Sequence, residues 1–150
     1  LALAGGTQGS MTGRENAEFV SRIYGDNDLE RANKLEFILD FSELGEYFDL
    51  PVNQYSSGMR SRLLFGLSMA FDFEIYLIDE IIAVGDIRFR KKSRQELLKK
   101  RGKSNYIIVS HNVNELIKEC DSLLVLNDGG VNLFNDTKEG LDFYFKLASD

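Results

Sequence analysis

Two short stretches of the sequence carry residues that suit phosphate chemistry. The first is Ser56-Ser57-Gly58, which is followed at helical spacing by the apolar residues Leu63, Leu67, Ala70 and Phe71. A serine here caps a helix, and a glycine lets a ligand approach the free N–H groups at the positive end of the helix dipole. The pattern therefore predicts a helix that begins near Gly58, with an anion site at its tip. An ordinary serine-capped core helix would give the same pattern.

The second stretch is an apolar run, residues 75–78, that ends in Asp79 and Glu80. A buried parallel strand is apolar along its length and presents the residues at its carboxyl end to a ligand. One carboxylate there can hold Mg²⁺, and its neighbour can orient or deprotonate an attacking water. A core strand that ends in two solvated acids is the alternative, and this motif alone leaves both interpretations open.

Together with their neighbours, these residues resemble the motifs of ATP-binding cassette (ABC) proteins. Residues 55–59 are similar to the signature motif, residues 76–80 to the Walker B strand with its catalytic glutamate, and residues 83–86 to the D-loop. The resemblance covers all 150 residues. It is closest to the ATP-binding subunits of capsular-polysaccharide, O-antigen and teichoic-acid exporters, in which serine and methionine similarly replace the usual glycine and glutamine. Met59 cannot supply the amide hydrogen bonds of glutamine, so how tightly the signature motif would bind across a dimer seam stays open.

The resemblance implies an α/β fold of the P-loop NTPase (RecA-like) type, in which a parallel sheet carries an inserted helical subdomain. Residues 10–72 would form the helical subdomain with the signature motif. Residues 1–9 and 73–150 would belong to the catalytic core. The DNA-repair branch of the family inserts a long heptad coiled coil in this region, and no sustained heptads occur between Gln8 and Ser56. The transporter branch is therefore favoured.

The sequence contains no G-x-x-x-x-G-K-[ST] phosphate loop. Gly102-Lys103-Ser104 does not complete one, because Leu97 stands where the first glycine is required. The resemblance implies that the phosphate loop and the adenine-stacking aromatic lie upstream of Leu1, so that the fold is incomplete at its N-terminus.

The family's roles carry over to the two motifs residue by residue. Ser56, Ser57 and Gly58 would contact the γ-phosphate of an ATP held by the opposite subunit. Asp79 would position Mg²⁺, and Glu80 would activate the attacking water. ATP and Mg²⁺ are accordingly the expected cofactors.

Three further polar residues gain a role from the family match. Gln8 resembles the Q-loop glutamine, which senses the γ-phosphate and Mg²⁺, whereas a single loop glutamine is otherwise most often solvated. His111, the only histidine, resembles the switch histidine at the γ-phosphate, whereas a lone histidine is otherwise more often structural. Asp86 resembles the D-loop aspartate that hydrogen-bonds across a dimer seam, and it could also simply cap the next helix.

Composition narrows the possible partners. Hydrophobic residues make up 43% and charged residues 28%, which is ordinary for a soluble globular domain. The net charge of -6 argues against general affinity for nucleic acid. Cys120, the single cysteine, excludes an internal disulfide and suits a reducing cytosol. No run approaches the ~20 apolar residues of a membrane span, so no direct membrane insertion is expected. The resemblance implies a homodimer with ATP sandwiched in it, an integral-membrane permease as partner, and a cytoplasmic position on the inner face of the membrane.

One segment runs against the overall acidity, because residues 87–103 hold nine basic residues and the single acid Glu96. A patch for nucleic acid or anionic lipid would have this composition. A solvated helix with Phe89, Leu97 and Leu98 turned inward would have it as well.

Periodicity and turn residues place the other elements. Helices are predicted at residues 12–24, 29–41, 43–48, 112–119 and 137–147, and strands at residues 105–109, 123–126 and 131–134. The apolar stripe of the first helix is assigned to Phe19, Val20 and Ile23.

The leading hypothesis is an ATP-hydrolysing subunit that drives a polysaccharide exporter. Two alternatives remain. The 150-residue chain could be a non-catalytic binding module, inactive alone because the phosphate loop is absent, or it could belong to a DNA-associated ABC ATPase.

Overall fold

The computed structural model describes residues 7–79 and 86–148. The chain divides into two compact units. The first, here called the helical unit, comprises Leu1–Tyr76 and Ile81–Tyr106. The second, the C-terminal unit, comprises Leu77–Glu80 and Ile107–Asp150.

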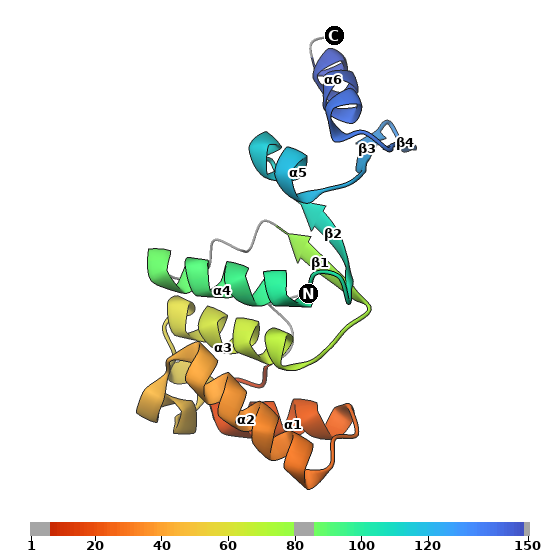
Figure 1. Cartoon of the computed structure of the whole chain (residues 1–150). Coiled ribbons are helices and arrows are strands. Elements are labelled where there is room, and N and C mark those ends of the chain that lie inside the picture. The colour runs from red at the N-terminus through yellow and green to blue at the C-terminus, as the bar shows by residue number, and fades with distance from the viewer. Residues whose placement is uncertain (1–6, 80–85, 149–150) are drawn as a thin grey trace. The chain divides into compact units, whose positions relative to one another are not determined.

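Helices dominate the helical unit. They are α1 (Gly13–Ile23), α2 (Asp28–Ser42), α3 (Ser57–Ala70) and α4 (Ile87–Lys100), with two short 3-10 turns, η1 (Gly45–Asp49) and η2 (Val52–Gln54), between α2 and α3. Thr12 and Asn27 begin α1 and α2, and each forms a reciprocal capping box with the glutamate three residues later. Helix α3 packs against both α2 and α4 and lies between them (Figure 1). These bounds confirm the predicted helices to within a few residues.

The core of this unit lies between α1, α2 and α3. Ile38, Phe48 and Leu63 are almost completely buried there. The stripe assigned to α1 was wrong in part, because Phe19 is 44% and Ile23 64% exposed. The buried side of α1 is instead made of small or polar residues, Gly13, Asn16, Ala17 and Ser21. Small side chains let α1 approach its neighbours closely, so the larger apolar residues face outward.

Two strands, β1 (Ile75–Asp79) and β2 (Asn105–Val109), pair in a parallel two-stranded sheet. Tyr76 is fully buried, stacks on Tyr106 at 5.5 Å between ring centroids, and donates its hydroxyl to the Phe71 carbonyl oxygen. Ile75 and Leu77, whose side chains alternate with Tyr76, are 55% and 53% exposed. The expectation that β1 is covered on both faces is therefore wrong for the part of the chain that the structure describes.

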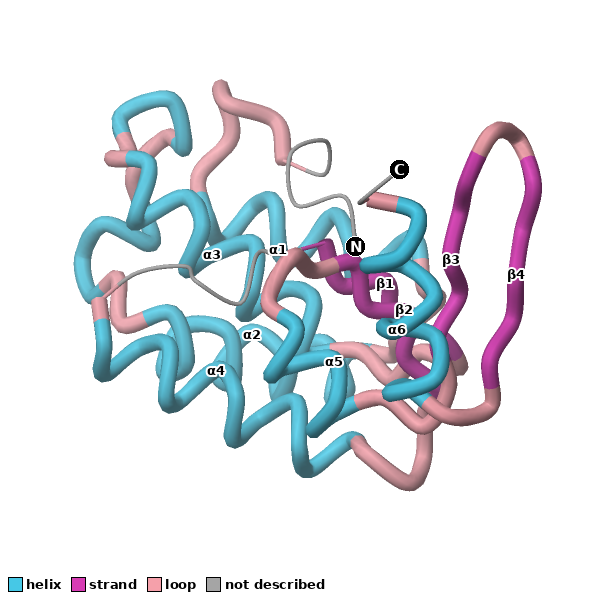
Figure 2. The backbone as a smooth tube through the Cα atoms, turned by 90° about the horizontal axis from the view of Figure 1, so that it is seen from above, coloured by secondary structure: helices cyan, strands magenta, loops and turns pink. Residues whose placement is uncertain are grey.

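The C-terminal unit contains α5 (Val113–Glu119), a hairpin of β3 (Leu123–Asn127) and β4 (Gly130–Phe134), and α6 (Thr137–Leu147). The strands pair antiparallel, from Leu123 opposite Phe134 to Asn127 opposite Gly130, and form the long hairpin drawn in magenta in Figure 2. Asp128 and Gly129 make the turn with φ of 46° and 75°. Positive φ at both positions is what a tight two-residue hairpin turn requires.

The connection between α1 and α2 holds a shielded ion pair that should make stability depend on pH. The Asp26 side chain is only 8% exposed, and its carboxylate accepts hydrogen bonds from Lys34 and Ser21. The hydrogen bond from Lys34, followed by that from Ser21, lowers the Asp26 pKa below its ordinary value of 3.8. A lowered pKa contributes stability above the unfolded value, and this contribution is lost as the pH falls through the folded value.

We expect Asp26→Asn to lower the free energy of unfolding at neutral pH, by a difference that shrinks toward zero below about pH 4. Urea titrations from about pH 7 to about pH 3 measure this difference. Asp28→Asn is the matched control, because the Asp28 side chain is 99% exposed. A difference between Asp26→Asn and the parent chain that stays constant with pH would contradict the assignment.

Candidate functional site

The start of α3 has the geometry expected of an anion site. Ser56 is exposed, has an extended backbone and caps α3, where its hydroxyl oxygen accepts from the Met59 N–H at 3.2 Å. The N–H groups of Ser57 and Gly58 belong to the first turn, whose N–H groups have no partner within a helix. A side chain at Gly58 would meet only the Ser56 hydroxyl, at 3.9 Å, so the backbone is open to approach.

The charge at this helix start also suits a phosphate group. The first turn of α3 contains no acidic residue, and the helix dipole adds positive potential there. Tyr55 fixes the segment that enters the helix, because its hydroxyl donates to the Tyr47 carbonyl oxygen at 2.6 Å. Burial raises the pKa of Tyr55, so this hydroxyl keeps its proton at neutral pH. The predicted helix start is thus confirmed, while phosphate contact by Ser56, Ser57 and Gly58 stays a prediction.

Gln8 lies with an exposed side chain on a loop whose backbone is held by Asn16 of α1. The Gln8 N–H donates to the Asn16 side-chain oxygen at 2.7 Å. The Asn16 amide group in turn donates to the carbonyl oxygens of Gln8, Met11 and Thr12, at 3.1, 3.3 and 2.8 Å. Asn16 was not among the site residues predicted from the sequence. The available signal for a role of Asn16 was that it is a polar residue on the same side of α1 as the small residues Gly13, Ala17 and Ser21.

We expect Asn16→Ala to lower the free energy of unfolding by about 1–3 kcal/mol, because it leaves buried backbone groups without partners. The same change should loosen the Gln8 loop, which amide exchange at Gln8 and Met11 would show. Asn53→Ala is the control, since Asn53 is exposed and holds Gly9 only through its backbone N–H, at 2.9 Å. Equal unfolding free energies for the two variants would contradict this role of Asn16.

The acidic motif and the histidine lie at or just beyond the carboxyl ends of neighbouring strands, and these strand ends belong to the C-terminal unit. Strand β1 ends at Asp79, and β2 ends two residues before His111. Since the strands are parallel, their carboxyl ends meet at the same edge. The side chain of Asp79 and all of Glu80 lie outside the described residues. His111 is exposed, and Ser110 beside it donates to Glu115 at 3.0 Å and accepts from the Asn112 N–H at 3.1 Å.

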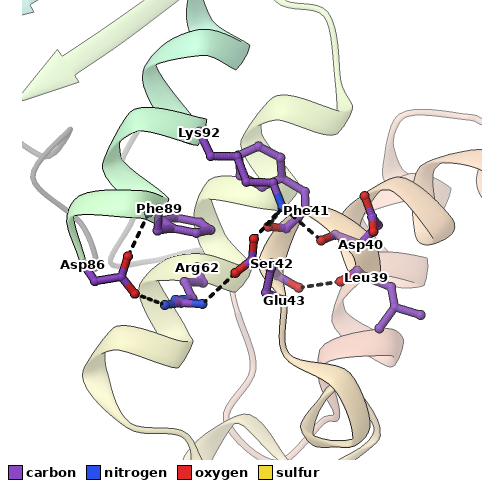
Figure 3. A network of polar contacts seen from close by, with 9 residues as sticks. All are labelled: Leu39, Asp40, Phe41, Ser42, Glu43, Arg62, Asp86, Phe89 and Lys92. Carbon is purple, nitrogen blue, oxygen red and sulfur yellow. Dashed lines mark hydrogen bonds and ion pairs between the residues drawn. The ribbon is translucent and has the colours of Figure 1, made fainter.

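Asp86 acts as the cap of α4. One carboxylate oxygen accepts from the Phe89 N–H at 2.9 Å, and the other accepts from Arg62 of α3 at 2.7 Å (Figure 3). These bonds, that from Phe89 first, lower the pKa of Asp86. The geometry confirms the helix-cap interpretation, and a contact of Asp86 across a dimer seam stays a prediction.

The basic residues of α4 are partly neutralised within the helical unit. Lys92, Lys99 and Lys100 form ion pairs with Glu43, Glu96 and Asp72, at 3.0, 2.7 and 2.6 Å. Phe89 and Leu97 are buried as the solvated-helix interpretation requires, whereas Leu98 is 46% exposed and does not turn inward.

Within residues 7–79 and 86–148, no group of three or more His, Cys, Asp or Glu side chains is placed to hold a metal ion. The side chain of Asp79, the proposed metal ligand, lies outside the described residues. No helix in the same residues is both long and apolar enough to cross a lipid bilayer.

Solved structures share the fold. One described as "Structure of ATP binding subunit of ABC transporter" superimposes with a TM-score of 0.76 over 91% of this chain and 58% of that one, at 17% identity. A second is described as "Dimeric structure of a post-hydrolysis state of the ATP-binding cassette MJ0796 bound to ADP and Pi". It superimposes with a TM-score of 0.63 over 83% of this chain and 56% of that one, at 25% identity. The predicted P-loop NTPase-type α/β fold is thereby confirmed.

No family model matches the chain, but individual proteins do. It is 48% identical over its whole length to the Polysialic acid transport ATP-binding protein KpsT of Escherichia coli, and covers 66% of that protein. It is 45% identical over 98% of its length to the Capsule polysaccharide export ATP-binding protein CtrD of Neisseria meningitidis serogroup B, and covers 67% of it. It is 34% identical over 96% of its length to the Teichoic acids export ATP-binding protein TagH of Enterococcus faecalis, and covers 32% of that protein.

The chain thus spans 61% to 67% of the length of its relatives from Escherichia coli, Neisseria meningitidis and Haemophilus influenzae. These identities are far above what the shared fold alone would give, and they confirm the resemblance found in the motifs. The chain belongs to the family of ABC ATP-binding subunits of polysaccharide and teichoic-acid exporters.

Proposed function

We propose that this chain forms part of an ATP-hydrolysing subunit that drives the export of a cell-surface polysaccharide. The observation that carries the proposal is the exposed, acid-free start of α3 at Ser56 and Gly58, in a chain 45% to 54% identical to three relatives named for polysialic acid transport or capsule polysaccharide export. An exposed helix start of this kind receives phosphate oxygens.

The residues present fit ATP and Mg²⁺ in the following roles. Ser56, Ser57 and Gly58 would bind the terminal phosphate through the hydroxyl groups and N–H groups at the start of α3. Asp79 would hold Mg²⁺, with Gln8 as a further ligand. The metal would neutralise charge on the phosphate oxygens when bound.

At the edge where β1 and β2 end, Glu80 would accept the proton of the attacking water, and His111 would contact the γ-phosphate. The anchored Ser110 supports the second role, because it restricts the position of the residue that follows it.

The proposed assembly is a homodimer, with each nucleotide between two subunits, bound to an integral-membrane permease on the cytoplasmic face of the membrane. The MJ0796 cassette is described as dimeric, and the relatives are named for transport or export. We assign residues 10–72 to the helical subdomain of the family and residues 1–9 and 73–150 to its catalytic core. The helical unit differs from this assignment, since it also includes Ile81–Tyr106.

The test compares the complete subunit with the 150-residue chain. The complete subunit should hydrolyse ATP in a Mg²⁺-dependent way, measured as phosphate release. The chain alone should bind a fluorescent ATP analogue weakly, because it contains no phosphate loop. Absence of hydrolysis by the complete subunit would overturn the proposal in favour of a binding module. Salt-sensitive DNA binding by the complete subunit would favour a DNA-associated ATPase instead.

A further inference from the structure

A chain of four charged residues joins three helices of the helical unit, α2, α3 and α4. Asp86 at the start of α4 accepts from Arg62 of α3 at 2.7 Å. Arg62 also donates to Glu43, directly after α2, at 3.4 Å. Glu43 accepts in addition from Lys92 of α4 at 3.0 Å, so that one carboxylate serves cations from two helices (Figure 3).

Lys92 also supplies a positive charge to the end of α2. The last turn of α2 contains no basic residue, although a cation there would stabilise the helix dipole. The Lys92 ammonium donates to the carbonyl oxygens of Asp40 and Phe41, at 3.2 and 3.0 Å, and to Glu43. An ammonium group has three donors, and all three are used here. Glu43 itself has a left-handed backbone, with φ of 54°, that ends α2.

Aromatic rings support the network from one side. Phe41, Phe65 and Phe89, one from each of the three helices, contact one another with ring centroids 5.5 to 6.4 Å apart. Arg62 lies over the Phe89 ring at 4.9 Å, and Lys92 lies over the Phe41 ring at 4.9 Å. The side chains of Glu43, Arg62 and Lys92 are only 22% to 32% exposed. Partly shielded charges in a network are worth more than isolated surface pairs.

We propose that Glu43 is a positioning residue for the ATP site, because it holds Arg62 and Lys92 and thereby fixes the start of α4 against the signature helix α3. The inference rests on the proposed function. Two motifs of the proposed site depend on how α3 and α4 are held together. Ser56 of the signature motif begins α3, and Asp86, which begins α4, follows Glu80 closely in the sequence. Among the described residues, the ion pairs of Glu43 are with Arg62 and Lys92, so it acts on the start of α4 through them.

Electrostatics agree with this arrangement. The hydrogen bond from Lys92 lowers the pKa of Glu43, and the charges of Lys92, Arg88 and Arg62 lower it further. Removal of the Glu43 charge would leave these cations facing one another with less compensation. The Arg62–Asp86 ion pair and the bonds from Lys92 to the end of α2 would remain, but no carboxylate would then join Arg62 to Lys92.

The experiment uses the complete subunit with Glu43→Gln, and with Glu46→Gln as a control at an exposed glutamate of η1. For Glu43→Gln we expect kcat for ATP hydrolysis to fall about three- to tenfold, with the KM for ATP changed less than about twofold. Hydrogen–deuterium exchange should rise in the first turn of α4 and at the end of α2. Glu43→Asp, which keeps the charge, should restore most of kcat. Since a loss of folded protein would also lower activity without changing KM, kcat is expressed per folded subunit, with the folded fraction measured by circular dichroism.

Lys92→Met tests the same network from α4, and should lower kcat and raise exchange in the same two segments. If the wild-type subunit is active and both Glu43→Gln and Lys92→Met have the wild-type kcat, this inference is overturned and the proposed function stands. Equal falls in kcat for Glu43→Gln and Glu46→Gln would also overturn it. An inactive wild-type subunit would overturn the proposed function itself.

Discussion

Replacement of Glu80 by glutamine in the complete subunit is expected to lower ATP hydrolysis about 10²–10⁴-fold and to leave ATP binding intact. Glutamine has nearly the shape of glutamate but cannot accept the proton of an attacking water. Glu80 follows Asp79, the last residue of β1, at the edge where the parallel strand β2 also ends. Phosphate release measures turnover, and equilibrium titration with a fluorescent ATP analogue measures binding.

The matched control for this substitution is Glu74→Gln. Glu74 is an exposed acid at the other end of β1, and it contacts β2 through its carbonyl oxygen, which accepts from the Asn105 N–H at 2.8 Å. Turnover should therefore stay at the wild-type level in this variant. Wild-type turnover in Glu80→Gln would defeat the assignment of the general base, and a parallel loss of ATP binding would give Glu80 a binding role instead.

Local rules explain why so many elements could be predicted. Helix starts at Thr12, Ser56 and Asp86 are marked by side chains that accept a backbone N–H, and a capping interaction extends over only a few residues. The hairpin turn is marked by Asp128 and Gly129, residue types that readily adopt positive φ. Such signals need no knowledge of the remaining chain, and the predicted bounds of these elements are accordingly close to the observed ones.

Contacts between distant residues could not be predicted from such rules. Glu43 meets Lys92 across 49 positions of sequence, and nothing near Glu43 marks it as the centre of a network. The burial of Asn16 in α1 was missed for the same reason, because a pattern that counts apolar residues selects Phe19 and Ile23 for the core. Of the candidate site, the helix start at Ser56 could be predicted from neighbouring residues. That β1 and β2 end at the same sheet edge depends on the pairing of two strands that are distant in sequence.

Close packing at Gly13 leads to the second large expected effect. Gly13 is the first residue of α1, and a Cβ atom there would lie 2.6 Å from the Tyr55 hydroxyl and 2.9 Å from the Phe48 ring. Neither neighbour can easily move, because Phe48 is fully buried and Tyr55 is hydrogen-bonded to Tyr47. Since Tyr55 directly precedes Ser56, a displaced Tyr55 ring would also shift the start of α3.

We therefore expect Gly13→Ala to lower the free energy of unfolding by about 1–3 kcal/mol, measured by urea titration. Gly66→Ala in α3 is the matched control, since its Cβ would meet Ile38 and Phe41 at ordinary contact distances of 3.5 to 3.7 Å. Alanine is the better helix former by about 1 kcal/mol, so the control should be as stable as the parent or more so. Gly13→Ala should also reduce ATP turnover of the complete subunit, whereas Gly66→Ala should not. Equal stability of the two variants would show that α1 and Tyr55 can separate without cost, and the anchoring of the Ser56 segment would then need another source.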